Sequence, residues 1–144
     1  MIGGQQGEPM IRIVYVSTAM PTLKDEHLAD ILQVANVRNA GLGITGLLVH
    51  NGRNFMQALE GPADCVLEVM SSISRDARHD GVIVISRETI TERAFPDWSM
   101  KLAQVGRAAG NAENLLISNG LDYAVVATMP GPLATMFTNF NSLD

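Results

Sequence analysis

The chain has 144 residues, a hydrophobic fraction of 47% and a formal net charge of −5, which predicts one domain with a packed core and excludes a disordered chain. The acidic balance argues against nucleic acid as a main partner, because phosphate contacts need a basic surface. The single Cys65 allows no intramolecular disulfide, and no signal peptide or membrane-spanning apolar run is present, so we expect a cytoplasmic protein without a membrane partner.

The first elements along the chain read as a strand followed by an amphipathic helix. Residues 10–16 form a short apolar run with β-branched residues, which predicts a strand. Thr22 with Asp25 resembles a capping box at the start of a helix. The apolar stripe of that helix leads to Asn39, and Gly41 is the expected C-terminal stop.

A hairpin, a second helix and two further strands follow. Residues 44–50 read as a strand buried on both faces, and Asn51-Gly52 predicts a tight turn into a return strand over 54–60. The order β-α-β-β-α-β with one more strand is the ferredoxin-like α+β pattern, with two helices on one face of the sheet. The remaining elements are a helix that opens at Gly61-Pro62, a polar loop over 75–81, and strands over 82–86 and 101–103.

The composition changes after Gln104, where glycine and asparagine become frequent. Asn111 is a candidate cap for a short helix, residues 121–128 are ambiguous between helix and strand, and Pro132 starts a last helix. Its apolar stripe needs cover, either from the free face of the sheet or from another subunit. The stripe consists of Leu133, Met136, Phe137 and Phe140. We therefore divide the chain into a flexible leader (1–9), a main domain (10–103) and a C-terminal helical extension (104–144).

Two familiar motif readings fail on context. Residues 41–46 match G-x-G-x-x-G, but here a helix ends and a strand begins, which is the reverse of a dinucleotide-binding turn. The three histidines, His27, His50 and His79, are scattered and have no completing Cys, Asp or Glu, so we expect no metal site.

The informative feature is a polar trio on otherwise apolar faces: Tyr15, Asn39 and Gln57. A buried amide without a partner costs about 1–3 kcal/mol, so such groups need an explanation. They either bond one another and nearby backbone, or they converge on a planar ligand with polar edges held between the helices.

Over residues 10–103 the chain resembles the BLUF domains, which are blue-light sensors that use flavin. The landmarks are Tyr15 with Ser17, Asn39-Ala40, Leu42-Gly-Ile-Thr-Gly-Leu-Leu48, Phe55 with Gln57, Leu59-Glu-Gly-Pro62, Asp76-Ala-Arg-His79 and Arg93-Ala-Phe-Pro-Asp-Trp-Ser-Met100. Their joint occurrence is specific, unlike the glycine motif alone.

The resemblance implies roles for individual residues. Tyr15 and Gln57 would be the photoactive pair beside the flavin ring, Asn39 would hold the pyrimidine edge, and Arg38 would reach the C2 carbonyl. FAD is the first expectation for the flavin, with FMN as the alternative. Other contacts would come from Ile31, Ile44, Leu47 and Phe55 along the ring and from Arg78 and His79 toward the ribityl and phosphate end.

The resemblance also implies a photocycle. Excited flavin would take an electron and a proton from Tyr15, and recombination would leave the Gln57 amide rotated or tautomerised. The flavin absorption would shift to the red until dark decay, and Trp98 and Met100 would relay the change. Such a cycle makes no product, so the implied protein is not an enzyme and signals through a downstream protein partner or through changed self-association as a homo-oligomer.

Two alternatives stay open at this point. A flavin-dependent oxidoreductase would use the same cofactor on a substrate, although no substrate-binding group is evident. A ferredoxin-like interaction module without a chromophore would satisfy the polar trio internally.

Overall fold

The computed structural model describes residues 9–96, 99–104 and 129–141. The elements follow the predicted β-α-β-β-α-β order with an added strand and a C-terminal helix. They are β1 (Met10–Ala19), α2 (Asp25–Leu42), β2 (Thr45–His50), β3 (Asn54–Pro62), α3 (Ala63–Ser74), β4 (His79–Ile90), β5 (Lys101–Gln104) and α5 (Gly131–Asn141). The expected short helix from Asn111 and the segment 121–128 lie outside the described residues.

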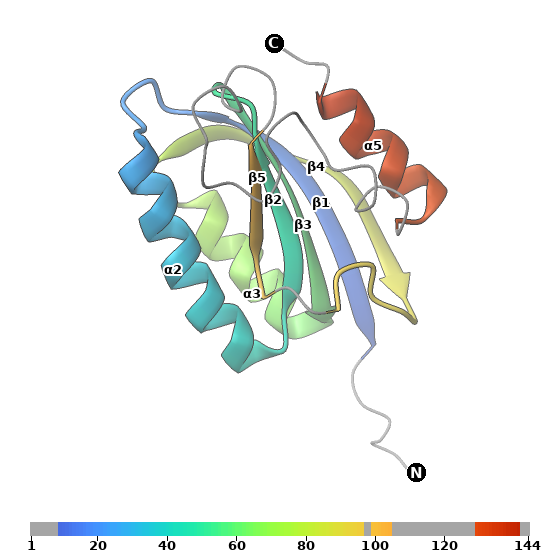
Figure 1. The fold of residues 1–144 in the computed structure, drawn as a ribbon. Helices are drawn as coiled ribbons and strands as arrows, with labels where there is room; N and C mark the ends of the chain where they lie inside the picture. Colours follow the sequence, from blue (N-terminus) through green and yellow to red (C-terminus); the bar gives the residue numbers. More distant parts are fainter. Residues whose placement is uncertain (1–8, 97–98, 105–128, 142–144) are drawn as a thin grey trace.

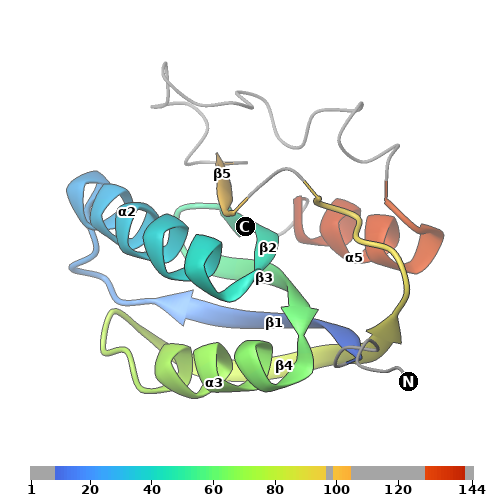
Figure 2. The ribbon, with the colours of Figure 1, turned by 90° about the horizontal axis from the view of Figure 1, so that it is seen from below.

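The sheet has the strand order β4-β1-β3-β2-β5. The first four strands are antiparallel, and β5 runs parallel to β2. Helices α2 and α3 cover one face, called here the helix face, while α5 lies on the opposite face, called the α5 face (Figures 1 and 2). This arrangement confirms the ferredoxin-like α+β prediction with two helices on one side.

Alternating side chains of the central strands divide the core in two. Ile11, Ile13 and Tyr15 of β1 pack on the helix face, whereas Val14 packs on the α5 face. Both faces are therefore buried, which explains why residues 44–50 read as a continuous apolar run.

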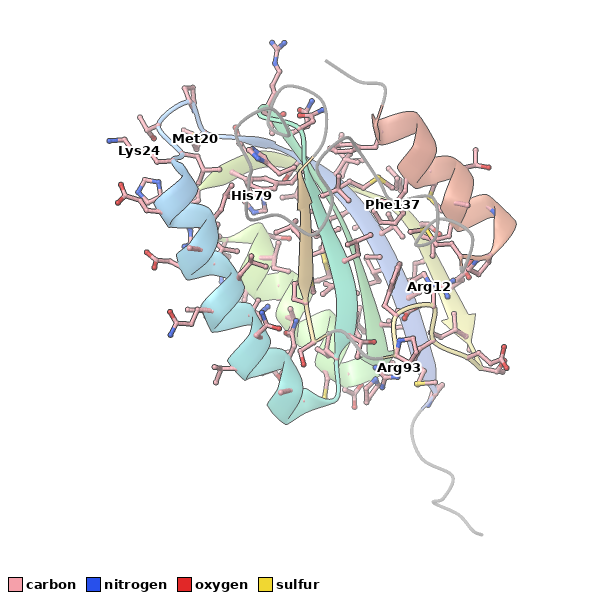
Figure 3. The ribbon with its side chains drawn as sticks, in the orientation of Figure 1. Arg12, Met20, Lys24, His79, Arg93 and Phe137 are labelled. Atoms are coloured by element: carbon pink, nitrogen blue, oxygen red, sulfur yellow. The ribbon has the colours of Figure 1, made fainter. Side chains whose placement is uncertain are left out.

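Helix α5 places its apolar stripe on the free face of the sheet. Leu133, Phe137 and Phe140 are buried there together with Leu47 and Met56 of the strands. Figure 3 shows Phe137 between α5 and the sheet. Of the two surfaces predicted to cover this stripe, the structure shows the free face of the sheet.

Helix α2 differs from prediction at both ends. It begins at Asp25, and the His27 ring accepts the backbone N–H of Lys24 at 2.9 Å. The predicted Thr22–Asp25 capping box is wrong, because Leu23 N–H bonds the Met20 carbonyl and places Thr22 in a turn before the helix. The predicted stop at Gly41 is also wrong by two residues, since Gly43 caps the helix at φ 70°.

Strand β4 is longer than the predicted 82–86 segment. It pairs with β1 from His79 to Ile90, with irregularities near Tyr15 and between Val16 and Thr18. Pairing with a long neighbour, rather than local propensity, extends this strand into the predicted loop.

The predicted hairpin turn is confirmed. Gly52 has φ 94°, and the Asn51 side-chain oxygen accepts the N–H groups of Arg53 and Asn54 at 3.0 and 2.7 Å. Within the described parts of the chain, no helix combines the length and apolar composition that crossing a membrane requires.

Candidate functional site

A cavity opens between α2, the end of α3 and the helix face of the sheet. Its empty space is about 570 Å³, including the part open to solvent. His79 points into this space from the start of β4 (Figure 3). The lining residues are Tyr15, Ile31, Val34, Ala35, Arg38, Leu48, Phe55, Gln57, Ile73, Asp76, Arg78 and His79.

Tyr15 and Gln57 form a hydrogen-bonded pair on the sheet side of this cavity. They lie opposite each other on β1 and β3, which puts both side chains on the helix face. The Tyr15 hydroxyl donates to the Gln57 amide oxygen at 2.6 Å, and the Gln57 NH₂ donates to the Met100 sulfur at 3.2 Å. All three side chains are buried. The amide therefore has a strong partner at one end and a weak sulfur acceptor at the other.

Burial keeps the Tyr15 phenol protonated. Desolvation raises its pKa well above the ordinary value, the Arg38 cation opposes that shift, and the Asp76 carboxylate adds to it. Tyr15 is thus a neutral donor throughout the physiological pH range. Burial of Arg38 lowers the pKa of its guanidinium, and the electrostatic effect of Tyr15 partly raises it again.

Asn39 is fully buried in the last turns of α2. Its NH₂ donates to the Ser99 carbonyl at 3.0 Å, and its oxygen accepts from Arg38 Nε at 3.1 Å. The residue is not part of the cavity lining, but its Arg38 neighbour is. Each member of the polar trio therefore has a partner within the chain, and Tyr15 and Gln57 face the cavity directly.

The outer rim of the cavity carries an ion pair and a fixed histidine. Asp76 accepts from the Arg78 guanidinium and from the Arg78 backbone N–H at 2.9 Å. The hydrogen bonds from Arg78 are the main reason why the pKa of Asp76 falls to about 2, and they raise the pKa of Arg78.

His79 is held on both ring nitrogens. Nε2 lies 2.7 Å from the Ile73 carbonyl and Nδ1 lies 2.8 Å from the Ser17 hydroxyl. A carbonyl only accepts, so Nε2 carries the proton, and in the neutral ring Nδ1 accepts from Ser17. The ring meets Tyr15 and Phe55 edge-on, each at 6.2 Å between centroids. Ser17 was a landmark of the resemblance but not among the predicted site residues, although the two-residue period places it on the same strand face as Tyr15.

The predicted ring contacts divide into three groups. Ile31 and Phe55 line the cavity, and Ile44 packs in the same core without lining it. Leu47 lies on the α5 face, so the structure does not bring it to the cavity; its neighbour Leu48 lines the cavity instead. Trp98 lies outside the described residues. Sequence reasoning missed Val34, Ala35, Leu48, Ile73 and Asp76, although Ala35 was on the predicted helix stripe.

The side chains around the cavity suit a flat heteroaromatic molecule. Apolar walls come from Ile31 and Phe55, the amide of Gln57 offers both a donor and an acceptor, and Arg38 supplies a cation. Among the described residues, no group of three or more His, Cys, Asp or Glu side chains is placed to hold a metal ion.

Comparison with curated proteins gives relatives that sense light. Photoactivated adenylate cyclase subunit alpha of Euglena gracilis is 34% identical over 102 residues, covering 69% of this chain and 10% of the relative. The beta subunit of Euglena longa is 36% identical over 92 residues, covering 63% of this chain and 11% of the relative. The chain thus spans about a tenth of the length of these curated relatives.

Solved structures with the same fold include two short proteins. BlrB, a BLUF protein in its dark state, has a TM-score of 0.70 and 28% identity, covering 93% of this chain and 95% of its own. BlsA in its ground state has a TM-score of 0.68 and 25% identity, covering 94% and 89%. The family model for BLUF, described as sensors of blue-light using FAD, matches residues 10–101. This chain belongs to the BLUF family of flavin-binding blue-light sensors.

Proposed function

We propose that the cavity beside α2 holds the flavin non-covalently and that Tyr15 and Gln57 are the pair that responds to its excitation. The observation that carries this proposal is the buried 2.6 Å hydrogen bond from Tyr15 to Gln57, with both residues lining the cavity. A phenol donor and an amide that line the same cavity are positioned to act together.

The cavity residues fit a flavin ring. Ile31, Leu48 and Phe55 supply apolar surface for its faces, while the Gln57 amide can meet a ring carbonyl or nitrogen. We assign the pyrimidine edge to Arg38, which lines the cavity, and to Asn39 behind it, whose side-chain oxygen accepts from Arg38 Nε at 3.1 Å.

Arg78 and His79 lie at the outer rim and are proposed for the ribityl and phosphate end. FAD is the proposed form, in line with the family description. FMN is the alternative, because Klebsiella pneumoniae BlrP1, which shares the fold at 30% identity, was solved with FMN. Release of the flavin by heat and chromatography would distinguish the two.

The chain's own residues supply a two-state switch. A bound flavin supplies the blue-light chromophore and an excited state that attracts an electron. The Tyr15 hydroxyl oxygen lies 2.6 Å from the Gln57 oxygen, so a proton that leaves the phenol has an acceptor in place. The Gln57 amide then rearranges by rotation or tautomerisation.

Rotation would turn the Gln57 NH₂ toward Tyr15 and its oxygen toward the Met100 sulfur, which lacks a proton to donate. The rotated state thereby loses a hydrogen bond of about 1 kcal/mol, which favours return in the dark. This asymmetry supports the assignment of Gln57 as a reversible element.

We further propose that the chain signals without catalysing a reaction. The cyclase activity named for the Euglena relatives belongs to proteins about ten times longer than the matched segment. The 10–103 domain would pass its signal to a protein partner or to a second copy, with the stripe from Leu133 to Phe140 near the junction.

Purified protein tests the proposal directly. It should be yellow and should show a small, reversible red shift of the flavin band under blue light. A colourless preparation that flavin cannot reconstitute would refute flavin binding. Steady consumption of a reductant under turnover conditions would favour an oxidoreductase instead.

A further inference from the structure

A buried carboxylate lies on β3, three residues beyond Gln57. Glu60 has no exposed surface and faces away from α2 and α3. One carboxylate oxygen accepts from Arg12 Nε at 2.7 Å and from the Ala94 backbone N–H at 2.9 Å; the other accepts from the Phe95 N–H at 3.0 Å. A carboxylate this deeply buried is stable only when such donors surround it, so these contacts are strongly favoured over their loss.

Ala94 and Phe95 belong to the connection between β4 and β5, residues 91–100. Arg93 fixes the same part of this connection from outside: its guanidinium donates to the Gly43 carbonyl at 2.7 Å, to Thr45 Oγ1 at 2.9 Å and to the Glu60 carbonyl at 3.2 Å. Figure 3 shows Arg12 and Arg93 toward the end of the sheet far from Met20 and Lys24. The start of the connection is thus anchored on β3 and on the chain that enters β2.

The far end of the same connection contacts Asn39 and Gln57, the second of which belongs to the proposed photoactive pair. The Ser99 carbonyl accepts from Asn39 at 3.0 Å, and the Met100 sulfur accepts from Gln57 at 3.2 Å. Both contacts come within five residues of Phe95. A shift at the anchor would therefore displace the two groups that accept hydrogen bonds from Asn39 and Gln57.

We infer that Glu60 is a positioning residue of the light-sensing site. By holding the amides of Ala94 and Phe95, it sets where the Ser99 carbonyl and the Met100 sulfur lie against Asn39 and Gln57. The effect on the photocycle rests on the proposed function, whereas the anchoring itself rests on contacts within the chain.

The same anchor also faces α5. The Phe95 ring is buried in the α5-face core and lies 6.4 Å from the Phe137 ring, edge-on. Glu60 therefore holds a segment that contacts the sensing site through Met100 and the C-terminal helix through Phe95.

The first test uses Glu60→Gln, which keeps the shape but replaces one acceptor oxygen by an NH₂ group. Amide hydrogen exchange followed by NMR should show the Ala94 and Phe95 amides exchanging about tenfold faster or more, because a charged acceptor is lost. With flavin bound, the dark-recovery rate should change by more than about twofold, as expected for coupled groups in one hydrogen-bond network.

Glu88→Gln is the matched control. Glu88 binds the same Arg12 at 2.6 Å through Nη1, but its side chain is 50% exposed. Its removal should leave the exchange of Ala94 and Phe95 and the recovery rate at wild-type values. Equal effects of both substitutions would show that Arg12, not Glu60, determines the behaviour, and would overturn the inference.

The remaining outcomes are separable. Wild-type exchange rates in Glu60→Gln would disprove the anchoring, and faster exchange with an unchanged photocycle would reduce Glu60 to a structural role. If the wild type lacks a light response, the proposed function fails, while the exchange measurement on flavin-free protein still decides the anchoring.

If Glu60→Gln does not fold, two further measurements apply. In the wild type, the Ala94 and Phe95 amides should exchange far more slowly than those of the exposed Thr91 and Glu92, and similar rates would contradict the anchor. Arg93→Gln removes the guanidinium contacts with Gly43, Thr45 and Glu60. It should change the dark-recovery rate in the same direction as a Glu60 substitution that does fold.

Discussion

Gln57 is the residue whose two ends meet chemically different neighbours. Its oxygen faces the Tyr15 hydroxyl and its NH₂ faces the Met100 sulfur. An amide offers a donor and an acceptor of nearly equal size and can exchange them by rotation. A switch at this position therefore needs no change in volume and no movement of the backbone.

Replacing Gln57 by Leu tests that role. The apolar side chain fills similar space but cannot accept from Tyr15, so we expect flavin to be retained and the reversible red shift to disappear. Absorption spectra recorded before and during blue illumination provide the measurement. Arg53→Gln, at the exposed hairpin tip, is the control and should keep the full shift. A normal shift in Gln57→Leu would exclude the amide as the switch.

The Asp76–Arg78 pair predicts an acid-dependent contribution to stability. The pKa of Asp76 falls to about 2 from an ordinary value of 3.8, mainly through hydrogen bonds from Arg78. A carboxyl whose folded pKa is depressed stabilises the fold above its unfolded pKa and loses that effect as the pH falls through its folded pKa. Because the side chains are 31% and 42% exposed, the contribution at neutral pH is about 1 kcal/mol or less.

Denaturant unfolding of the wild type and of Asp76→Asn measures this contribution. Asn keeps an oxygen for the Arg78 N–H but loses the charge. The wild type should be more stable at pH 6, and the difference should shrink between about pH 4 and pH 2. The difference in stability between the wild type and Arg78→Gln should shrink over the same pH range. A difference that stays constant over this pH range would contradict the ion pair as its cause.

At the scale of elements, the end of α2 depends on one glycine. Gly43 has φ 70°, and its N–H bonds back to the Asn39 carbonyl, the same residue whose side chain contacts Ser99. A side chain in this left-handed conformation costs about 1–2 kcal/mol. Gly43→Ala should therefore destabilise the domain by about that amount, measured by thermal or denaturant unfolding.

Gly41→Ala is the matched control for that substitution. Gly41 lies inside α2, and a Cβ there would meet nothing within 4 Å. Alanine at an exposed helical site should stabilise by about 0.5–1 kcal/mol. Opposite signs at two glycines only two residues apart are the expected result. Equal losses at both would refute the observed position of the helix end.

Sequence patterns predicted the kinds and order of these elements but not all of their limits. The helix ends were missed because Thr22 and Gly41 carry capping signals as strong as those of Lys24 and Gly43, and only tertiary contacts choose between them. The extent of β4 depends on pairing with β1, which local propensity does not encode.

The site was predictable where polar residues interrupt an apolar pattern, as at Tyr15 and Gln57. It was not predictable where the pattern is uniformly apolar. Leu47 and Leu48 are adjacent in a strand buried on both faces, so hydrophobicity cannot tell which one faces the cavity. Ser17 was missed for a different reason: it shares the face of Tyr15 by the two-residue period, but its partner His79 comes from a distant strand.

At the scale of the molecule, α5 completes a three-layer structure, with the sheet between the pair α2 and α3 and the C-terminal helix (Figure 1). The cavity lies on the helix face, so the sheet separates it from α5. Phe137 is the centre of that contact: it is 0% exposed and packs with Phe95 and the α5 face of the strands. Among the described residues, the sheet and the β4–β5 connection both join the cavity side to the α5 face.

Phe137→Ala tests whether α5 packs on the sheet in solution. The truncation should cost about 3–5 kcal/mol in the free energy of unfolding, because a fully buried ring leaves a cavity. Thr135→Ala, at an exposed position of the same helix, should change stability by about 0.5 kcal/mol or less. Since Phe137 lies on the face opposite the cavity, flavin content should stay near the wild-type value in both. A loss below about 1 kcal/mol for Phe137→Ala would show that α5 is not seated on the sheet of the free protein, and would leave its apolar stripe for a partner.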